Sequence, residues 1–140
     1  AGKEQAKIMY QQGVDIIQGV AGLTEVGIIE AAKEMGKWVI PCDKDKTEMC
    51  EGAQLTSSIK KIDAAVMEAA TKAQAGEFSG GTRSLGLKEG TVGFPDAARD
   101  VVAPEIMKIV DQVIEKIISG EIVVPSTREE YEAFTPPTIL

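Results

Sequence analysis

The sequence has 140 residues, 44% of them hydrophobic, and a formal net charge of −7. This length suits a single globular domain, and the acidic balance argues against binding to nucleic acid or to an anionic membrane surface, because both need clustered lysine and arginine. No apolar run approaches the roughly 18 to 20 residues of a membrane-spanning helix, and no signal-peptide pattern is present. The chain begins on Ala1 rather than on a methionine, and we expect it to be a piece of a longer protein.

The first part of the chain predicts alternating helices and strands. Apolar residues recur at helical spacing over 3–12, and a short strand follows at 14–17. A turn of small residues leads into a helix over 23–35, and an apolar strand follows at 38–40. Such alternation is typical of a parallel sheet with right-handed crossovers, so we predict an α/β fold.

The second part predicts three more helices and a pair of strands. One helix covers 62–74, and two short strands at 83–87 and 91–94 flank a tight turn. A long helix over 104–119 starts with a proline, whose missing N–H costs nothing at that position. A final helix begins after residues 126–127, where a hydroxyl side chain can cap it.

Residues 37–60 hold the candidate functional site. The strand at 38–40 ends before Pro41, which cannot donate a hydrogen bond to a sheet, and the carboxylates Asp43 and Asp45 follow at once. Open α/β sheets bind ligands just beyond the carboxyl ends of their strands. A second polar run ends on Lys60. We therefore interpret this stretch as half of a small-molecule cleft.

Several other chemistries were weighed for these residues. Cys42 and Cys50 could form a disulfide or remain two thiols, with Cys42 packed as a small hydrophobic residue. Asp43, Asp45 and Glu48 could bind Ca²⁺ or Mg²⁺, but the ligand set is incomplete, and the chain has no histidine and only two cysteines. An acid–base pair of Asp43 and Asp45 is also conceivable, but no catalytic motif accompanies it. We expect no metal, no cofactor and no enzymatic activity.

Seven short blocks of sequence occur in an order and spacing that match one protein family. They are residues 14–17, 20–22, 30–34, 40–45, 56–63, 86–93 and 117–122, the last with Pro125. Together they resemble the C-terminal part of the basic membrane protein family. Its members are substrate-binding lipoproteins of ABC importers, and several bind purine nucleosides.

The resemblance implies the fold of type I periplasmic binding proteins, in which two α/β lobes joined by a three-stranded hinge close on a ligand. Residues 1–140 would then be the C-terminal portion, with the C-terminal lobe and part of the hinge and of the N-terminal lobe. The N-terminal half, with its lipidated cysteine, would be absent. That half grips the base in this family, so this chain alone is expected to bind nucleoside weakly. The full protein would be lipid-anchored in the cell envelope, on the outer face of the cytoplasmic membrane or in the periplasm.

By motif, the family's ribose-binding residues fall on Gly22, Asp43 and Lys60. A carboxylate can accept both hydroxyl protons of a sugar diol, and Lys60 could donate to a ribose oxygen and pair with Asp43. Gly22 would let backbone N–H groups approach the ligand. The alternatives are a turn aspartate, a solvated lysine at the start of a helix, and a simple tight turn.

Other residues of the motifs depart from the family or have structural roles. Leu23 and Glu25 replace glycines, and two lysines, at positions 44 and 46, change the charge next to Asp43, which bears on the identity of the ligand. Thr56 and Ser57 are expected to hydrogen-bond the backbone where the chain crosses the hinge. Trp38 is expected in the core.

The function implied by the resemblance is that of the solute-binding component of an ABC importer. The ligand would be a purine nucleoside or a related ribose-containing molecule, and an ABC permease would be the partner. One alternative is a ligand-sensing domain of a receptor or regulator with the same fold, and another is a flavodoxin-like enzyme that uses Asp43. A chain that holds one lobe should expose apolar surface, so we expect it to bind its missing half or to self-associate.

Overall fold

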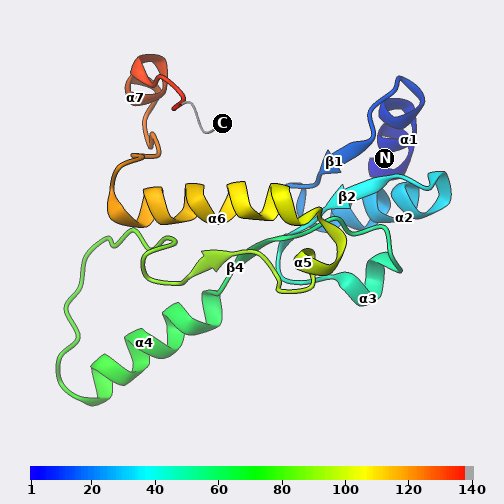
Figure 1. Ribbon diagram of the computed structural model, residues 1–140. Coiled ribbons are helices and arrows are strands. Elements are labelled where there is room, and N and C mark those ends of the chain that lie inside the picture. The colour runs from blue at the N-terminus through cyan, green and yellow to red at the C-terminus, as the bar shows by residue number, and fades with distance from the viewer. Residues whose placement is uncertain (138–140) are drawn as a thin grey trace.

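The computed structural model describes residues 1–137, and its first part alternates helices and strands as predicted (Figure 1). The elements are α1 (Gly2–Gln11), β1 (Ile16–Gln18), the 3-10 helix η1 (Gly22–Thr24), α2 (Glu25–Met35) and β2 (Trp38–Ile40). β1 and β2 pair in parallel, with Ile17 opposite Val39. Residues 53–55 extend this sheet, because the Val39 N–H donates to the Ala53 carbonyl at 2.9 Å.

The hydrophobic core lies where α1 and α2 pack on these strands. Its fully or nearly buried members are Ala6, Tyr10, Ile17, Ile29, Ala31, Ala32, Val39, Cys50 and Ala53. The Tyr10 hydroxyl donates to the Trp38 carbonyl at 2.7 Å, so even the polar atom of this core residue is satisfied. Burial raises the pKa of Tyr10 to about 12. The predicted α/β class is confirmed.

The rest of the chain forms a second small sheet and several helices. The elements are β3 (Cys42–Asp43), α3 (Thr47–Cys50), β4 (Ser58–Lys60), α4 (Ile62–Gln74), β5 (Val92–Gly93), α5 (Ala98–Val101), α6 (Pro104–Ser119) and α7 (Arg128–Ala133). The strand order is β3–β4–β5, with β3 parallel and β5 antiparallel to β4. In Figure 1, α4 projects away from the first sheet and α6 runs across the molecule.

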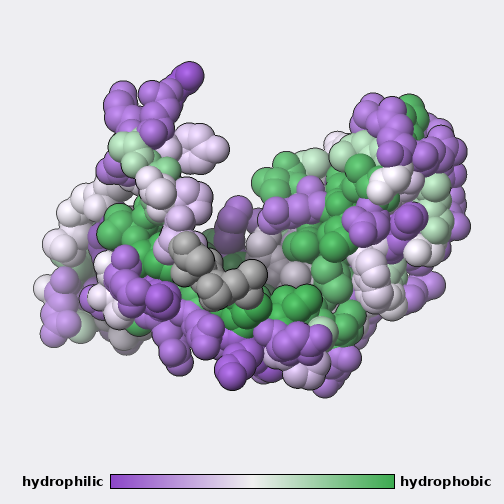
Figure 2. All heavy atoms as spheres, turned by 45° about the horizontal axis from the view of Figure 1, so that its top comes forward, coloured by the Kyte–Doolittle hydropathy of each residue, from purple (hydrophilic) through white to green (hydrophobic). Residues whose placement is uncertain are grey.

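The outline of the molecule is open rather than compact. Figure 2 shows a wide hollow with hydrophobic surface along its floor. Large apolar side chains are exposed on α4, including Ile62, Val66 and Met67, and on α6, including Ile106 and Ile118. No helix among residues 1–137 is both long enough and apolar enough to cross a membrane.

The long elements agree with the sequence-based predictions. β2, α4 and α6 have the predicted bounds, and α7 begins with a capping box at Thr127. The Thr127 hydroxyl accepts from the Glu130 N–H at 3.2 Å, and the Glu130 carboxylate accepts from the Thr127 N–H at 3.1 Å. The short elements β3, α3, β4 and α5 were not predicted.

Of the two strands predicted at 83–87 and 91–94, only the second forms, as β5, and its partner is β4 rather than the segment 83–87. The Gly86 N–H donates instead to the Glu89 carboxylate at 2.8 Å, and the Thr91 N–H donates to the Gly86 carbonyl at 3.1 Å. This segment therefore closes a turn on itself.

The expectation that Trp38 lies in the core is also wrong. Successive side chains of a strand point to opposite faces, and Val39 is the residue of β2 that is fully buried. The Trp38 side chain remains 38% exposed.

Candidate functional site

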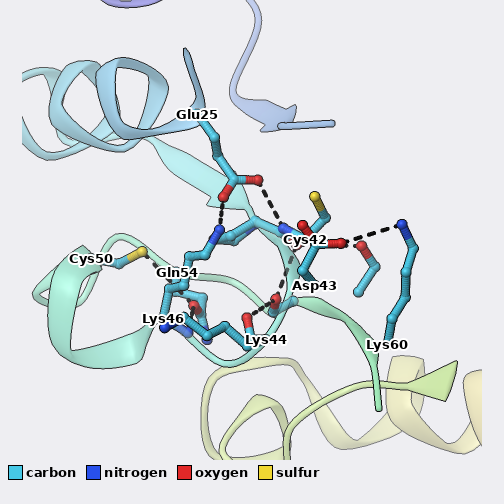
Figure 3. Close-up of polar contacts among 11 residues, drawn as sticks. Glu25, Cys42, Asp43, Lys44, Lys46, Cys50, Gln54 and Lys60 are labelled. Carbon is cyan, nitrogen blue, oxygen red and sulfur yellow. Dashed lines mark hydrogen bonds and ion pairs between the residues drawn. The ribbon is translucent and has the colours of Figure 1, made fainter. Parts of the chain in front are cut away.

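The candidate site lies at the ends of β3 and β4. These strands are parallel, and Asp43 is opposite Ile59, so the last residue of β4, Lys60, lies next to the end of β3. The Asp43 Oδ1 and the Lys60 Nζ are 3.3 Å apart, and their side chains are 54% and 55% exposed. Figure 3 shows the two side chains pointing toward each other from neighbouring strands. The predicted pairing of Asp43 with Lys60 is thus present, and Lys60 ends a strand rather than starting a helix.

Asp43 is ionised at neutral pH and has an unusual backbone conformation. The hydrogen bond from Lys60 is the main cause that lowers the pKa of the Asp43 carboxyl below its ordinary value. Its φ is +75°, in the left-handed region, which aspartate tolerates better than most residues. Such backbone strain persists only where the surrounding structure enforces it. The loop that follows is accordingly well supported.

The first support comes from Glu25, at the start of α2. Its side chain is 2% exposed. Its Oε1 accepts from the Cys42 N–H at 2.9 Å, and its Oε2 forms an ion pair with the Lys46 ammonium. Figure 3 shows the Glu25 carboxylate reaching from α2 to both groups. One buried carboxylate therefore joins α2 to two points of the loop.

The second support comes from Gln54. Its Oε1 accepts from the Lys46 N–H at 3.1 Å, and its Nε2 donates to Asp45 Oδ1 at 2.7 Å and to Thr47 Oγ1 at 2.9 Å. The Gln54 hydrogen bond is the main cause that lowers the pKa of Asp45. Asp45 is thus engaged within the loop.

These carboxylates do not have the properties of an acid–base pair. Asp43 and Asp45 both have lowered pKa values, whereas a general acid needs a raised one. No group of three or more His, Cys, Asp or Glu side chains that could hold a metal ion occurs among residues 1–137.

Ser57 holds the same loop from the other side. Its hydroxyl donates to the Lys44 carbonyl at 2.7 Å and to the Pro41 carbonyl at 3.0 Å. The Thr56 hydroxyl is buried without a hydrogen-bond partner in the described part of the chain. The expectation that both hydroxyls satisfy backbone groups is therefore right for Ser57 and wrong for Thr56.

Gly22 starts η1 with a φ of +54°, and a Cβ added there would meet open space. The positive φ explains why glycine suits this turn. Within residues 1–137, no hydrogen bond or ion pair joins Gly22 to Asp43 or Lys60. Its contact with a ligand stays a prediction.

The two cysteines are separate buried thiols. Burial raises the pKa of Cys50 to about 11 and, with the nearby Glu25 carboxylate as a further cause, also raises the pKa of Cys42. A thiol needs a lowered pKa to act as a nucleophile, so both fit a structural role.

Glu25 and Gln54 are the site residues that sequence reasoning missed. In the sequence, Glu25 stands out only because it replaces a glycine of the family pattern, and Gln54 belongs to no predicted helix or strand. The only sign of this role in the sequence was a glutamate among small residues. That sign did not indicate which groups the Glu25 carboxylate contacts.

Known proteins match this chain over nearly its whole length. The family described as ABC transporter substrate-binding protein PnrA-like matches residues 1–128. Basic membrane protein A of Borreliella burgdorferi is 37% identical in an alignment of 138 residues that covers 96% of this chain and 40% of that protein. The CD4+ T-cell-stimulating antigen of Listeria monocytogenes is 36% identical, over 89% of this chain and 39% of that protein. The chain thus spans about two fifths of these relatives.

Solved structures show the same fold. An ABC transporter system solute-binding protein from Aeropyrum pernix superposes with a TM-score of 0.80 and 32% identity, over 94% of this chain and 46% of that one. A protein described as a transcriptional activator of the comK gene from Bacillus halodurans superposes with a TM-score of 0.78 and 21% identity, over 85% and 42%. The fold is therefore that of part of a type I periplasmic binding protein.

Proposed function

Because this chain belongs to the family of PnrA-like ABC transporter substrate-binding proteins, we propose that it binds the ribose of a purine nucleoside or a related ligand for an ABC importer. In this proposal, the Asp43 carboxylate accepts hydrogen bonds from the ribose hydroxyls. Lys60 donates to a ribose oxygen, and backbone N–H groups near Gly22 approach the ligand.

The observation that carries the proposal is the half-exposed pair of Asp43 and Lys60. Exposed ion pairs contribute little to stability, typically about 0 to 1 kcal/mol, so folding alone gives little reason for this one. A carboxylate and an ammonium side by side at the ends of two strands present an acceptor and a donor to a ligand. A sugar diol offers the complementary donors and acceptors.

The remaining parts of the proposal concern the whole protein. The chain would be the C-terminal portion of a two-lobed protein. In it, β4 would lead from the part that contains β1 and β2 to α4. Ligand would close the lobes, and the closed form would dock on an ABC permease. The protein would lie outside the cytoplasm, held by a lipid anchor. The extent of the match to the family supports these inferences.

The test is calorimetric titration of adenosine, guanosine and inosine into the natural protein that contains this chain. Asp43→Ala should weaken ribonucleoside binding by at least about tenfold, because it removes hydrogen bonds to a charged acceptor. The control is Asp63→Ala, which removes an equal charge from the exposed start of α4. Unchanged affinity in the Asp43 variant, or no affinity of the wild type for any of the three nucleosides, would count against the proposal.

A further inference from the structure

Glu25, Gln54 and Ser57 are polar or charged side chains that lie buried. All three bind the segment over residues 41–47, which runs from β3, ending on Asp43, through a loop to the start of α3. Burying a polar group is costly unless it is hydrogen-bonded, and apolar residues would fill the same space without that cost. Their convergence on one loop indicates that the conformation of this loop is held for a reason other than core packing.

One of these supports includes a charged partner, because buried Glu25 forms an ion pair with Lys46. The Lys46 side chain is only 16% exposed, so its ammonium is largely withdrawn from solvent. Figure 3 shows Lys46 directed to Glu25, whereas Lys60 is directed to Asp43. The two lysines therefore neutralise two different carboxylates, and Lys46 acts on the site through the loop.

Lys46 is placed where its contacts can affect the backbone conformation of Asp43. It lies three residues after Asp43 in the same loop, its N–H is held by Gln54, and its ammonium is held by Glu25, which also binds the N–H immediately before Asp43. The loop is thus clamped on both sides of the residue whose φ is +75°. Releasing one clamp would let Asp43 relax to an ordinary conformation and move its carboxylate.

We propose that Lys46, through its ion pair with buried Glu25, is a positioning residue that holds Asp43 in the conformation that binds a ribose diol. The inference rests on the proposed function, because it assigns Lys46 a role only if Asp43 binds the sugar. Lys46 would contribute to the preference of the site for ribonucleosides over nucleosides that lack the 2′- and 3′-hydroxyls.

The experiment compares adenosine with 2′,3′-dideoxyadenosine, by titration into the natural protein that contains this chain. Inosine and guanosine with their dideoxy forms replace them if adenosine is not the ligand. Lys46→Met should weaken binding of the ribonucleoside by about tenfold, within the 10- to 100-fold range measured for supporting contacts in metal sites. Binding of the dideoxy form should not weaken comparably. Lys108→Met, the same substitution at an exposed side chain of α6, should change neither affinity.

Two further variants separate positioning from folding. Lys46→Arg keeps the ion pair and should restore most of the preference. Glu25→Gln combined with Lys46→Met removes both buried charges, so it avoids leaving one unpaired, and it should fold while still showing the reduced preference. Melting temperatures of all variants are recorded alongside the affinities.

The outcomes distinguish failure of the role proposed for Lys46 from failure of the proposed ribose binding by Asp43. If Asp43→Ala lowers the ribonucleoside preference but Lys46→Met and the double variant do not, the inference alone is overturned. Equal weakening of both ligands in the Lys46 variants would assign Lys46 a structural role only, and would also overturn it. If Asp43→Ala leaves the preference unchanged, the proposed ribose role fails, and the inference fails with it.

Discussion

The carboxylate of Asp43 is both ionised and accessible, because its partner Lys60 approaches from a neighbouring strand and leaves it half exposed. The hydrogen bond from Lys60 lowers the pKa of Asp43, and the thiol of Cys42 and the charge of Lys46 contribute in the same direction. The acceptor therefore stays charged well below neutral pH.

This lowered pKa predicts how ribonucleoside binding depends on pH. A group with a depressed pKa keeps its charge above the ordinary value and loses it as the pH falls through the lower one. Affinity should thus be constant from pH 7 down to the ordinary aspartate value of 3.8 and fall only below it. Titration calorimetry over this range checks it, with circular dichroism to confirm that the protein stays folded. A loss of affinity between pH 6 and 5 in the folded protein would contradict the assignment of Asp43.

Among the individual site residues, sequence reasoning found those whose role follows from local position. Asp43 comes directly after a strand, where ligands bind in open sheets. Glu25 and Gln54 escaped notice because their partners, Cys42 and Lys46, lie on other elements. No local spacing rule indicates such a contact.

At the scale of elements, α1 and α2 approach each other closely at glycines. A Cβ added at Gly27 would lie 2.7 Å from the Lys3 backbone nitrogen, and one at Gly2 would lie 2.6 Å from the Thr24 carbonyl oxygen. Both distances are below any ordinary van der Waals contact, so the packing of the two helices requires glycine. This packing forms one side of the core on which β1 and β2 rest.

We therefore predict that Gly27→Ala destabilises the protein. Overpacking costs typically about 1–3 kcal/mol, and the obstacle here is backbone, which cannot rotate away. Alanine improves helix propensity by at most about 1 kcal/mol, so the clash should dominate. The midpoint of urea unfolding measures the effect, and Gly80→Ala, where an added Cβ meets open space, is the control. A variant as stable as the wild type would show that α1 and α2 can separate without cost.

The elements themselves were predicted in proportion to their length. α4 and α6 repeat their apolar pattern over several turns, and their bounds were predicted correctly. β3 has two residues, too few for any alternation to show, and β5 takes up only two residues of the strand predicted at 91–94. Both form because they hydrogen-bond to β4, which lies between them in the sheet. The position of β4 depends on the path of the chain.

At the scale of the whole molecule, the exposed apolar surface is the dominant feature. Hydrophobic residues line the floor of the hollow in Figure 2, and α4 exposes Ile62 and Val66, which lie one helical turn apart. Soluble monomers rarely expose large contiguous apolar patches. We infer that another polypeptide covers this surface, and the N-terminal half of the proposed two-lobed protein would be the natural occupant.

The isolated 140-residue chain should consequently self-associate, or bind the missing half when the two are produced together. Sedimentation velocity over a range of concentrations measures this. Val66→Lys should weaken association by placing a charge in the exposed apolar face of α4, whereas Gln74→Lys, which adds a charge at an exposed polar site of the same helix, should not. A monomeric wild-type chain with cooperative melting would contradict the inference.

The sequence by itself determined the α/β class, the long helices, the strand at 38–40 and the placement of Asp43 beyond it, because periodicity and chain order encode these features locally. The resemblance to the family predicted that Lys60 pairs with Asp43. Only the tertiary structure decided that Glu25 and Lys46 pair beneath the same loop, and that α4 lies exposed. Each of these depends on where distant segments meet, and that is set by packing across the molecule.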